Sequence, residues 1–221
     1  MLYIVPTPLG NLNDMSQRAK DTLEACDFII AENPLVTGKL IKLLELDKKP
    51  IVQFADHNET KVLDKYLQRL KTESAALVSD AGTPGISDPG FRLVRAAREE
   101  GIEVIAIPGP SAAITALSAS GLPTDKFMFV GFFPKTEHKV LELVSQSQTT
   151  ELTLIAYESP QRIVKTLEYI EKGFPNCKAV VARELTKLHE EYLTGTPSEV
   201  ITQLKTKPSI KGEITLLISC K

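Results

Sequence analysis

The sequence predicts an α/β protein of two domains, residues 1–110 with a mostly parallel sheet and residues 111–221 with a mixed sheet. Short runs of Ile, Val, Leu and Ala alternate with helical patterns in the first half, which is typical of strands buried on both faces of a parallel sheet. In the second half some gaps between strand-like runs are short, which favours antiparallel pairing. At 221 residues the chain suffices for one large domain or two small ones.

The first half contains strand-like runs at residues 2–5, 27–31, 50–54, 75–79 and 103–107. The first helix carries an apolar pattern that begins at Met15, with Asp14 and Gln17 as its start signal. A second helix has its apolar face at residues 62–70, and a third follows the fourth strand and ends at Gly101.

The second half has strand-like runs at residues 127–131, 152–157, 178–183, 190–193 and 213–218. Residues 185–189 are a connection of hairpin length, which predicts an antiparallel pair. One helix fits the apolar positions between 163 and 170.

Composition excludes several classes of protein. A net charge of −2 gives no global basic field for nucleic acid, although a local basic patch remains open. Cys26, Cys177 and Cys220 are odd in number and widely spaced. They are expected to be small buried residues rather than a disulfide framework or zinc site. The chain begins directly with a strand-like run and has no long apolar segment, so a cytoplasmic location is expected.

Residues 79–90 form the most informative segment, called here the glycine-rich loop. It holds three glycines, two prolines and two aspartates between an apolar strand and a helix. Similar Gly/Pro clusters follow other strands at residues 6–11 and 108–112. Because ligands bind outside the carboxyl ends of strands in open α/β sheets, we expect the three loops to converge on a small ligand.

The ligand is not expected to be a polyphosphate. None of the three loops matches a dinucleotide or P-loop glycine pattern, and none contains Lys or Arg. Their hydroxyls and carboxylates suit a zwitterionic or nucleoside-like ligand. Asp80 at a strand end can pair an amine or a ribose hydroxyl, or it can serve only as an N-cap or Asx-turn residue.

Metal and nucleophile sites are weakly indicated. The three histidines are isolated, and no G-x-S-x-G elbow is present. The polar cluster of residues 56–59, with His57, Asn58 and Glu59, either binds substrate or is the capped start of the next helix.

In their composition and in their order along the chain, these motifs resemble those of the tetrapyrrole methylase superfamily of S-adenosylmethionine-dependent methyltransferases. Its closest likeness is to the ribosomal RNA small subunit methyltransferases that modify a cytidine ribose 2′-hydroxyl. The resemblance covers nearly the whole chain. Its segments are residues 3–12, 56–59, 77–84, 108–112, 121–123, 157–159, 182–187 and 211–213.

The resemblance implies two α/β domains with a folded S-adenosylmethionine in the cleft between them, a homodimer, and small-subunit rRNA or the small ribosomal subunit as partner. Carried over by position, the cofactor site would comprise Pro8, Val78, Ser79, Asp80, Thr83, Ser111, Ala112, Tyr157, Glu158 and Gly195.

Orientation should supply much of the rate of methyl transfer, and a proton-accepting group near the ribose hydroxyl would help. Glu184 and Lys187 are the candidate catalytic residues, with a structural ion-pair cluster as the alternative interpretation. Candidate substrate-binding residues are Glu32, His57, Asn58, Glu59 and Arg183.

The chain also departs from the family pattern. The usual Glu-Asp-Thr-Arg after the second strand reads Glu32-Asn33-Pro34-Leu35, and Pro34 is expected to rearrange the local backbone. The segment after residues 131–134 lacks the family's run of basic residues, and the chain ends soon after its last strand. These changes are expected to weaken or redirect RNA binding. Two alternatives therefore stay open: a tetrapyrrole C-methyltransferase, and a cofactor-binding relative without catalysis.

Overall fold

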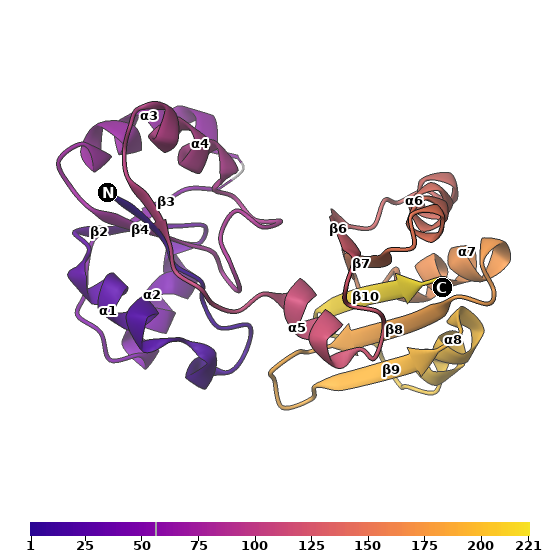
Figure 1. Ribbon diagram of the computed structural model, residues 1–221. Helices are drawn as coiled ribbons and strands as arrows, with labels where there is room; N and C mark the ends of the chain where they lie inside the picture. Colours follow the sequence, from indigo (N-terminus) through magenta and orange to yellow (C-terminus); the bar gives the residue numbers. More distant parts are fainter. Residues whose placement is uncertain (56) are drawn as a thin grey trace. The chain divides into compact units, whose positions relative to one another are not determined.

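The computed structural model describes residues 1–55 and 57–221, which divide into two compact units, Met1–Ser111 and Ala112–Lys221 (Figure 1). Each unit is built around its own sheet with helices packed on it, as the predicted α/β class requires. Within the described residues, every helix is too short or too polar to span a bilayer.

All strands of the N-terminal sheet run parallel, in the spatial order β3-β2-β4-β1-β5. The strands are β1 (Leu2–Ile4), β2 (Phe28–Ala31), β3 (Ile51–Gln53), β4 (Ala75–Val78) and β5 (Val104–Ala106). β2 and β4 are buried at every residue, which explains their continuous apolar sequences. Because the strands are parallel, their carboxyl ends share one edge.

Helices cover both faces of this sheet (Figure 1). One face carries α1 (Gln17–Ala25) and α2 (Pro34–Leu43), and the other carries α3 (Glu59–Leu70) and α4 (Phe91–Glu99). The chain crosses the sheet in one direction from β1 to β3 and in the opposite direction from β3 to β5. Since crossovers are right-handed, the two directions place their helices on opposite faces.

The C-terminal sheet is mixed, in the order β6-β7-β10-β8-β9. Its strands are β6 (Phe127–Phe132), β7 (Thr153–Glu158), β8 (Lys178–Arg183), β9 (Glu191–Gly195) and β10 (Ile214–Ser219). β6 and β7 are parallel, and the other neighbours are antiparallel. β6, β7 and β8 therefore end at one edge, called here the carboxyl edge of the C-terminal unit.

One face of the C-terminal sheet packs against α6 (Glu137–Thr149), α7 (Ile163–Gly173) and α8 (Pro197–Lys205), which lie together in Figure 1. Alternate strand residues such as Leu154, Val181 and Leu216 fill this core. The residues between them point to the opposite face, where α5 (Ala112–Ala119) contacts β7 and β10.

The ten strand-like runs all correspond to strands, with ends shifted by at most two residues. The hairpin prediction for residues 185–189 is confirmed by antiparallel pairing of β8 with β9. The predicted start of the first helix was misplaced. Asp14 ends a short 3-10 helix (Leu12–Asp14), and Ser16 is the N-cap of α1, its Oγ accepting a hydrogen bond from the Ala19 N–H at 3.2 Å.

The apolar patterns did not predict α2, α5, α6 or α8. Two of these helices, α2 and α8, begin with clear capping signals. α2 starts at Asn33-Pro34, where the Asn33 side chain accepts a hydrogen bond from the Leu35 N–H and proline occupies the first turn. α8 starts with a capping box formed by Thr196 and Glu199. At these two helices the capping residues mark the start, which the apolar pattern did not reveal.

The expectation for the cysteines was wrong for two of the three residues. Cys177 and Cys220 form a disulfide across 43 positions of sequence, whereas Cys26 is a buried free thiol. The bond joins the residue before β8 to the residue after β10. Since β8 and β10 are antiparallel neighbours, those two ends meet at one edge of the sheet, a proximity that cysteine spacing alone does not reveal.

Candidate functional site

The loops after β1 and β4 are joined at the carboxyl edge of the N-terminal sheet. Thr7 and Gly82 form an isolated antiparallel bridge, with N···O distances of 2.9 and 3.0 Å. The buried Thr7 hydroxyl also donates to the Ser79 carbonyl at 3.1 Å. Gly82 has a φ of +85°, a conformation that favours glycine. The expected convergence of these two loops is therefore present in detail.

The loop after β5 joins the same group. The Thr83 hydroxyl donates to the Pro110 carbonyl at 2.8 Å. A Cβ on Gly109 would lie 2.7 Å from the Pro6 Cβ, so only glycine allows the first and third loops to approach this closely. The three loops hold one another through backbone and hydroxyl contacts, which fixes the shape of this edge.

The predicted cofactor residues of this unit lie on those loops. Val78 ends β4 and is buried, as is Ser79, whereas Pro8 and Thr83 are half-buried. Ser111 is the last residue of the N-terminal unit, and Ala112 is the first residue of α5.

Asp80 and Glu32 are brought together at this edge. The Asp80 N–H donates to the Glu32 Oε2 at 3.3 Å. Asp80 is an exposed residue, yet its carboxyl is partly enclosed and desolvation raises its pKa. A hydrogen bond from the Asn33 backbone lowers the pKa but does not outweigh desolvation. Two acidic side chains from neighbouring strands, with no Lys or Arg in the three loops, suit a ligand that bears an amine or hydroxyls.

The altered segment after β2 is an ordinary helix start. Asn33 is the N-cap of α2, Pro34 lies in its first turn and Leu35 is exposed. Because proline is pre-organised for the first turn, Pro34 fits this helix start without interrupting it. Glu32 keeps its place beside Asp80.

The polar cluster before α3 is largely structural among its described members. Asp56 lies outside the described residues. Asn58 Oδ1 accepts a hydrogen bond from the Ala55 N–H at 2.8 Å. Glu59, only 7% exposed, accepts one from the Gly90 N–H at 3.2 Å and lies 3.5 Å from Arg92 Nε. His57 is exposed. Glu59 thus holds the far end of the glycine-rich loop.

Glu158 is a buried carboxylate with internal partners. It accepts hydrogen bonds from the Ser159 N–H at 2.8 Å and the Thr166 hydroxyl at 2.6 Å. Arg162 lies 3.1 Å from it and also donates to the carbonyls of Phe133 and Pro134. Arg162 was missed by sequence reasoning, because residue 158 ends a strand and the four-residue spacing is not a helical one.

Glu184 and Lys187 follow β8 on the same carboxyl edge. Lys187 Nζ lies 2.9 Å from Glu184 Oε1 and 2.9 Å from Glu213 Oε2. The Glu213 N–H donates to Glu184 Oε1 at 3.0 Å. Glu184 and Thr186 have φ values of +53° and +64°. Such strain in non-glycine residues persists only where the surroundings over-determine it, and it is concentrated at functional sites.

The electrostatics of this cluster keep both groups charged. Burial of the Glu184 carboxyl would raise its pKa, but hydrogen bonds from Lys187 and the Glu213 backbone outweigh burial and hold the pKa below its ordinary value. Burial would lower the pKa of Lys187, and its two carboxylate partners raise it instead. Arg183 is paired with Glu191 and donates to the Lys211 carbonyl at 2.8 Å.

Gly195 is not brought to this edge. It ends β9 opposite Ala179, whereas Arg183 is opposite Glu191. The four-residue offset is about 13 Å along the strand. Within the C-terminal unit the structure therefore brings Tyr157, Glu158 and Arg183 together and separates Gly195 from them.

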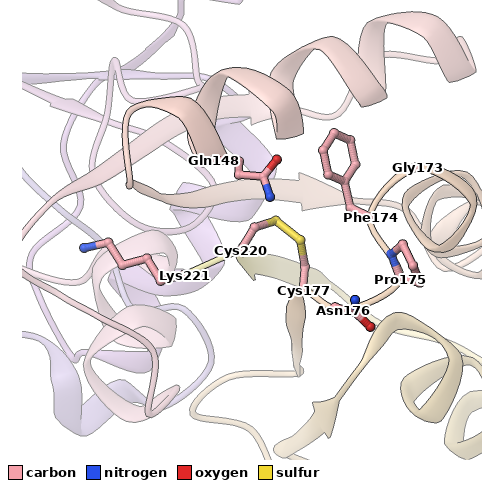
Figure 2. A pocket seen from close by; sticks show the side chains of 8 residues that line it. All are labelled: Gln148, Gly173, Phe174, Pro175, Asn176, Cys177, Cys220 and Lys221. Carbon is pink, nitrogen blue, oxygen red and sulfur yellow. A yellow bond between two sulfur atoms is a disulfide. The ribbon is translucent and has the colours of Figure 1, made fainter.

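A surface pocket of the C-terminal unit lies at the edge opposite these residues (Figure 2). It is lined by Gln148, Gly173, Phe174, Pro175, Asn176, Cys177, Cys220 and Lys221. Among the described residues, none of the predicted site residues contributes to it. The described residues also contain no cluster of His, Cys, Asp and Glu arranged to hold a metal ion.

Comparisons with known proteins support the family resemblance seen in the sequence. A family model described as Tetrapyrrole (Corrin/Porphyrin) Methylases matches residues 1–201. A protein of Hydrogenobaculum sp. named ribosomal RNA small subunit methyltransferase I is 46% identical over 220 residues, covering 99% of this chain and 95% of its own. A protein of the same name from Thermotoga maritima is 40% identical, and the match covers 100% of this chain and 98% of that protein. One from Escherichia coli O157:H7 is 43% identical, and the match covers 98% of this chain and 77% of that protein.

Solved structures share the fold at low identity. Diphthine synthase superposes with a TM-score of 0.77 at 14% identity, covering 99% of this chain and 89% of its own. Cobalt precorrin-4 methyltransferase superposes with a TM-score of 0.68 at 16% identity, covering 98% of this chain and 93% of its own.

Proposed function

Because the chain belongs to the tetrapyrrole (corrin/porphyrin) methylase family, we propose that it transfers a methyl group from S-adenosylmethionine to a cytidine ribose 2′-hydroxyl in small-subunit rRNA. The observation that carries the proposal is 40–46% identity, over nearly the whole chain, to proteins named ribosomal RNA small subunit methyltransferase I. A cytoplasmic location and a homodimer belong to the same proposal.

The loops at the carboxyl edge of the N-terminal sheet fit such a methyl donor. S-adenosylmethionine supplies a methyl group on a positively charged sulfur that is already activated for transfer. The chain provides the carboxylate of Asp80 for a positively charged or hydroxyl-bearing group, and hydroxyls and backbone groups for the rest. The residues proposed to hold it are Pro8, Val78, Ser79, Asp80, Thr83, Ser111 and Ala112, with Tyr157, Glu158 and Gly195 from the second unit.

Glu158 and Gly195 are the weaker members of that set. The Glu158 carboxylate is already satisfied by Ser159, Thr166 and Arg162, so any contact it makes would be through its backbone or through Arg162. Gly195 lies at the other edge of its sheet. Tyr157 is half-buried on β7 and faces away from the helix-covered core.

Glu184 and Lys187 are proposed to contact the acceptor ribose. With its pKa held low, Glu184 is ionised and accepts hydrogen bonds, but it is a weak base. Lys187 stays protonated and can donate to a phosphate or hydroxyl oxygen. The chemistry therefore relies on orienting the hydroxyl more than on removing its proton beforehand. The proposed substrate-binding set also contains Arg183, Glu32, His57, Asn58 and Glu59. Within it, Asn58 and Glu59 act indirectly, because their side chains hold loops in place.

The tetrapyrrole C-methyltransferase alternative is less favoured. Its substrates carry many carboxylates and call for converging Arg and Lys side chains. Arg183 and Lys187, at the carboxyl edge of the C-terminal unit, are instead already paired with carboxylates of the chain itself. The non-catalytic alternative rested on the altered segment after Glu32, and that segment forms a well-capped helix start.

The proposal is tested by incubating the protein with methyl-labelled S-adenosylmethionine and three acceptors: small ribosomal subunits, free small-subunit rRNA, and a uroporphyrinogen. We expect label on rRNA, in whole subunits or free, at a single ribose. Label on the uroporphyrinogen would establish the tetrapyrrole alternative. Cofactor binding without transfer to any acceptor would establish the non-catalytic one.

A further inference from the structure

Phe132 is a large apolar side chain that stays 61% exposed at the end of β6. β6 is an edge strand, paired only with β7 among the described residues. Phe133, the next residue, is 2% exposed and belongs to the core beneath α6 and α7. Two adjacent phenylalanines thus point to opposite faces of the sheet.

A β-bulge at Gly131 produces this arrangement. The pairing of β6 with β7 shifts register between Phe129 and Phe132, and Gly131 has a φ of +68°. In an unbroken strand, residue 132 would share the helix-covered face with Met128 and Val130, which pack on the core. The extra residue turns Phe132 to the other face instead. Bulges that re-aim a side chain in this way are frequent beside functional sites.

The re-aimed ring rests on a second ring. Phe132 meets Tyr157 edge-to-face, with centroids 5.7 Å apart and an interplanar angle of 72°. Tyr157 is supported in turn by Phe129 at 5.0 Å. These contacts occupy one part of the Phe132 ring and hold its orientation, while most of its surface faces solvent.

The surroundings of Phe132 suit a nucleic acid. Phe132 lies level with Tyr157, Thr215 and Ala182 across the sheet, one residue from the end of β8 at Arg183. Lys135, three residues on, is exposed and has no ion-pair partner among the described residues. Aromatic rings beside cations are the way proteins hold unpaired bases and the phosphates that join them.

We propose that Phe132 is a stacking platform for an unpaired base of the RNA substrate, with Lys135 contacting an adjacent phosphate. The proposal rests on the proposed rRNA methyltransferase function and deepens it by naming how the RNA strand is held. It assigns RNA binding, rather than chemistry, to Phe132, whose ring is supported by Tyr157.

The test compares Phe132→Ala with Phe127→Ala, a control at the opposite end of the same strand that is 42% exposed. We expect Phe132→Ala to raise the Kd for an rRNA fragment containing the target, and the KM for small subunits, roughly ten- to hundredfold, as loss of one stacked base predicts. The single-turnover rate at saturating RNA should fall by a smaller factor than the affinity does. Phe127→Ala should bind RNA as the parent does.

The chain has no tryptophan, so Phe132→Trp introduces a single tryptophan whose emission can be excited apart from that of the five tyrosines. We expect this variant to bind RNA at least as tightly as the parent and its emission to be quenched when the rRNA fragment is added. Lys135→Ala should reduce the slope of log K against log salt by about one, whereas Phe132→Ala should leave the slope unchanged.

Three outcomes would overturn the proposal. Equal RNA affinity of Phe132→Ala and the parent would exclude stacking. A loss of S-adenosylhomocysteine affinity without a loss of RNA affinity would assign the ring to the cofactor. A change of oligomeric state at unchanged RNA affinity would assign it to a protein contact. If instead the parent protein methylates no rRNA, the proposed function fails and the platform loses its premise, a result visible in the parent before any variant is compared.

Discussion

Glu59 accepts a hydrogen bond from the Gly90 N–H at 3.2 Å, so the first residue of α3 holds the last residue of the glycine-rich loop. Gly90 has a φ of +138°, and a Cβ there would lie 2.9 Å from Leu77 Cδ2. Carboxylate and glycine together fix the path by which the loop leaves the carboxyl edge and enters α4.

Glu59→Ala should weaken both stability and cofactor binding. The substitution leaves the buried Gly90 N–H without its acceptor, at a cost of about 1–3 kcal/mol in the free energy of unfolding. It also frees the loop end, so the Kd for S-adenosylhomocysteine should rise. Urea denaturation and calorimetric titration measure the two effects. Arg92→Ala is the control for the cofactor effect, because it removes the exposed partner of Glu59 but keeps the Gly90 contact, and it should leave cofactor affinity unchanged. Unchanged cofactor affinity in Glu59→Ala would show that the loop does not depend on this contact.

Glu184→Gln should slow methyl transfer without weakening cofactor binding. The amide keeps the shape of the side chain but loses the ion pair to Lys187, so the acceptor ribose is oriented less well. A single-turnover assay with labelled cofactor on rRNA measures the step directly. An unchanged rate would remove Glu184 from the mechanism and leave it a structural residue.

The same residue predicts a pH dependence of stability. Its folded-state pKa lies below the ordinary value of 4.5, so the stability it contributes is complete above that value and is lost as the pH falls through the folded pKa. The difference in unfolding free energy between the parent and Glu184→Gln should therefore be constant near neutral pH and shrink below about pH 4.5. A difference that grows on acidification would reverse the assigned direction of the shift.

The Cys177–Cys220 disulfide should stabilise the C-terminal unit without affecting activity. Closing a loop of 43 residues is worth about 4 kcal/mol in the chain-entropy model. The bond lies at the edge opposite Glu158, Arg183 and Glu184. A Cys177→Ser/Cys220→Ser variant should unfold at lower urea concentration yet keep its transfer rate, and reductant should lower the midpoint of the parent but not of this variant. Cys26→Ser keeps the disulfide and is the control, so reductant should lower its midpoint as it lowers that of the parent. Identical midpoints with and without reductant would contradict a formed disulfide.

Asn33→Ala should cost about 1 kcal/mol of stability, the usual value of an N-cap, because the Leu35 N–H loses its acceptor. Methyl transfer should be retained, since Glu32 and Asp80 keep their contact. Thermal unfolding and the labelled-cofactor assay are the measurements. If Asn33→Ala abolishes transfer at unchanged stability, the segment after β2 acts in the reaction itself.

The sequence predicted the fold well where hydrophobicity decides structure. The apolar runs of β2 and β4 and the loop clusters after β1, β4 and β5 follow from burial and from the geometry of parallel strands. Side-chain directions and contacts between residues far apart in the chain could not be predicted from the sequence. The roles of Glu59 and Arg162 depend on contacts with residues more than 28 positions away in the chain. The role of Phe132 depends on one bulge in β6. The Cys177–Cys220 bond depends on the pairing of β8 with β10.

Mapping ribose 2′-O-methylation in small-subunit rRNA, with the gene present, deleted and restored, tests the central claim most directly. The account predicts that deletion removes methylation from one cytidine ribose, that the intact gene restores it, and that Glu184→Gln restores it incompletely. A deletion strain that keeps every ribose methyl group would contradict the proposed function.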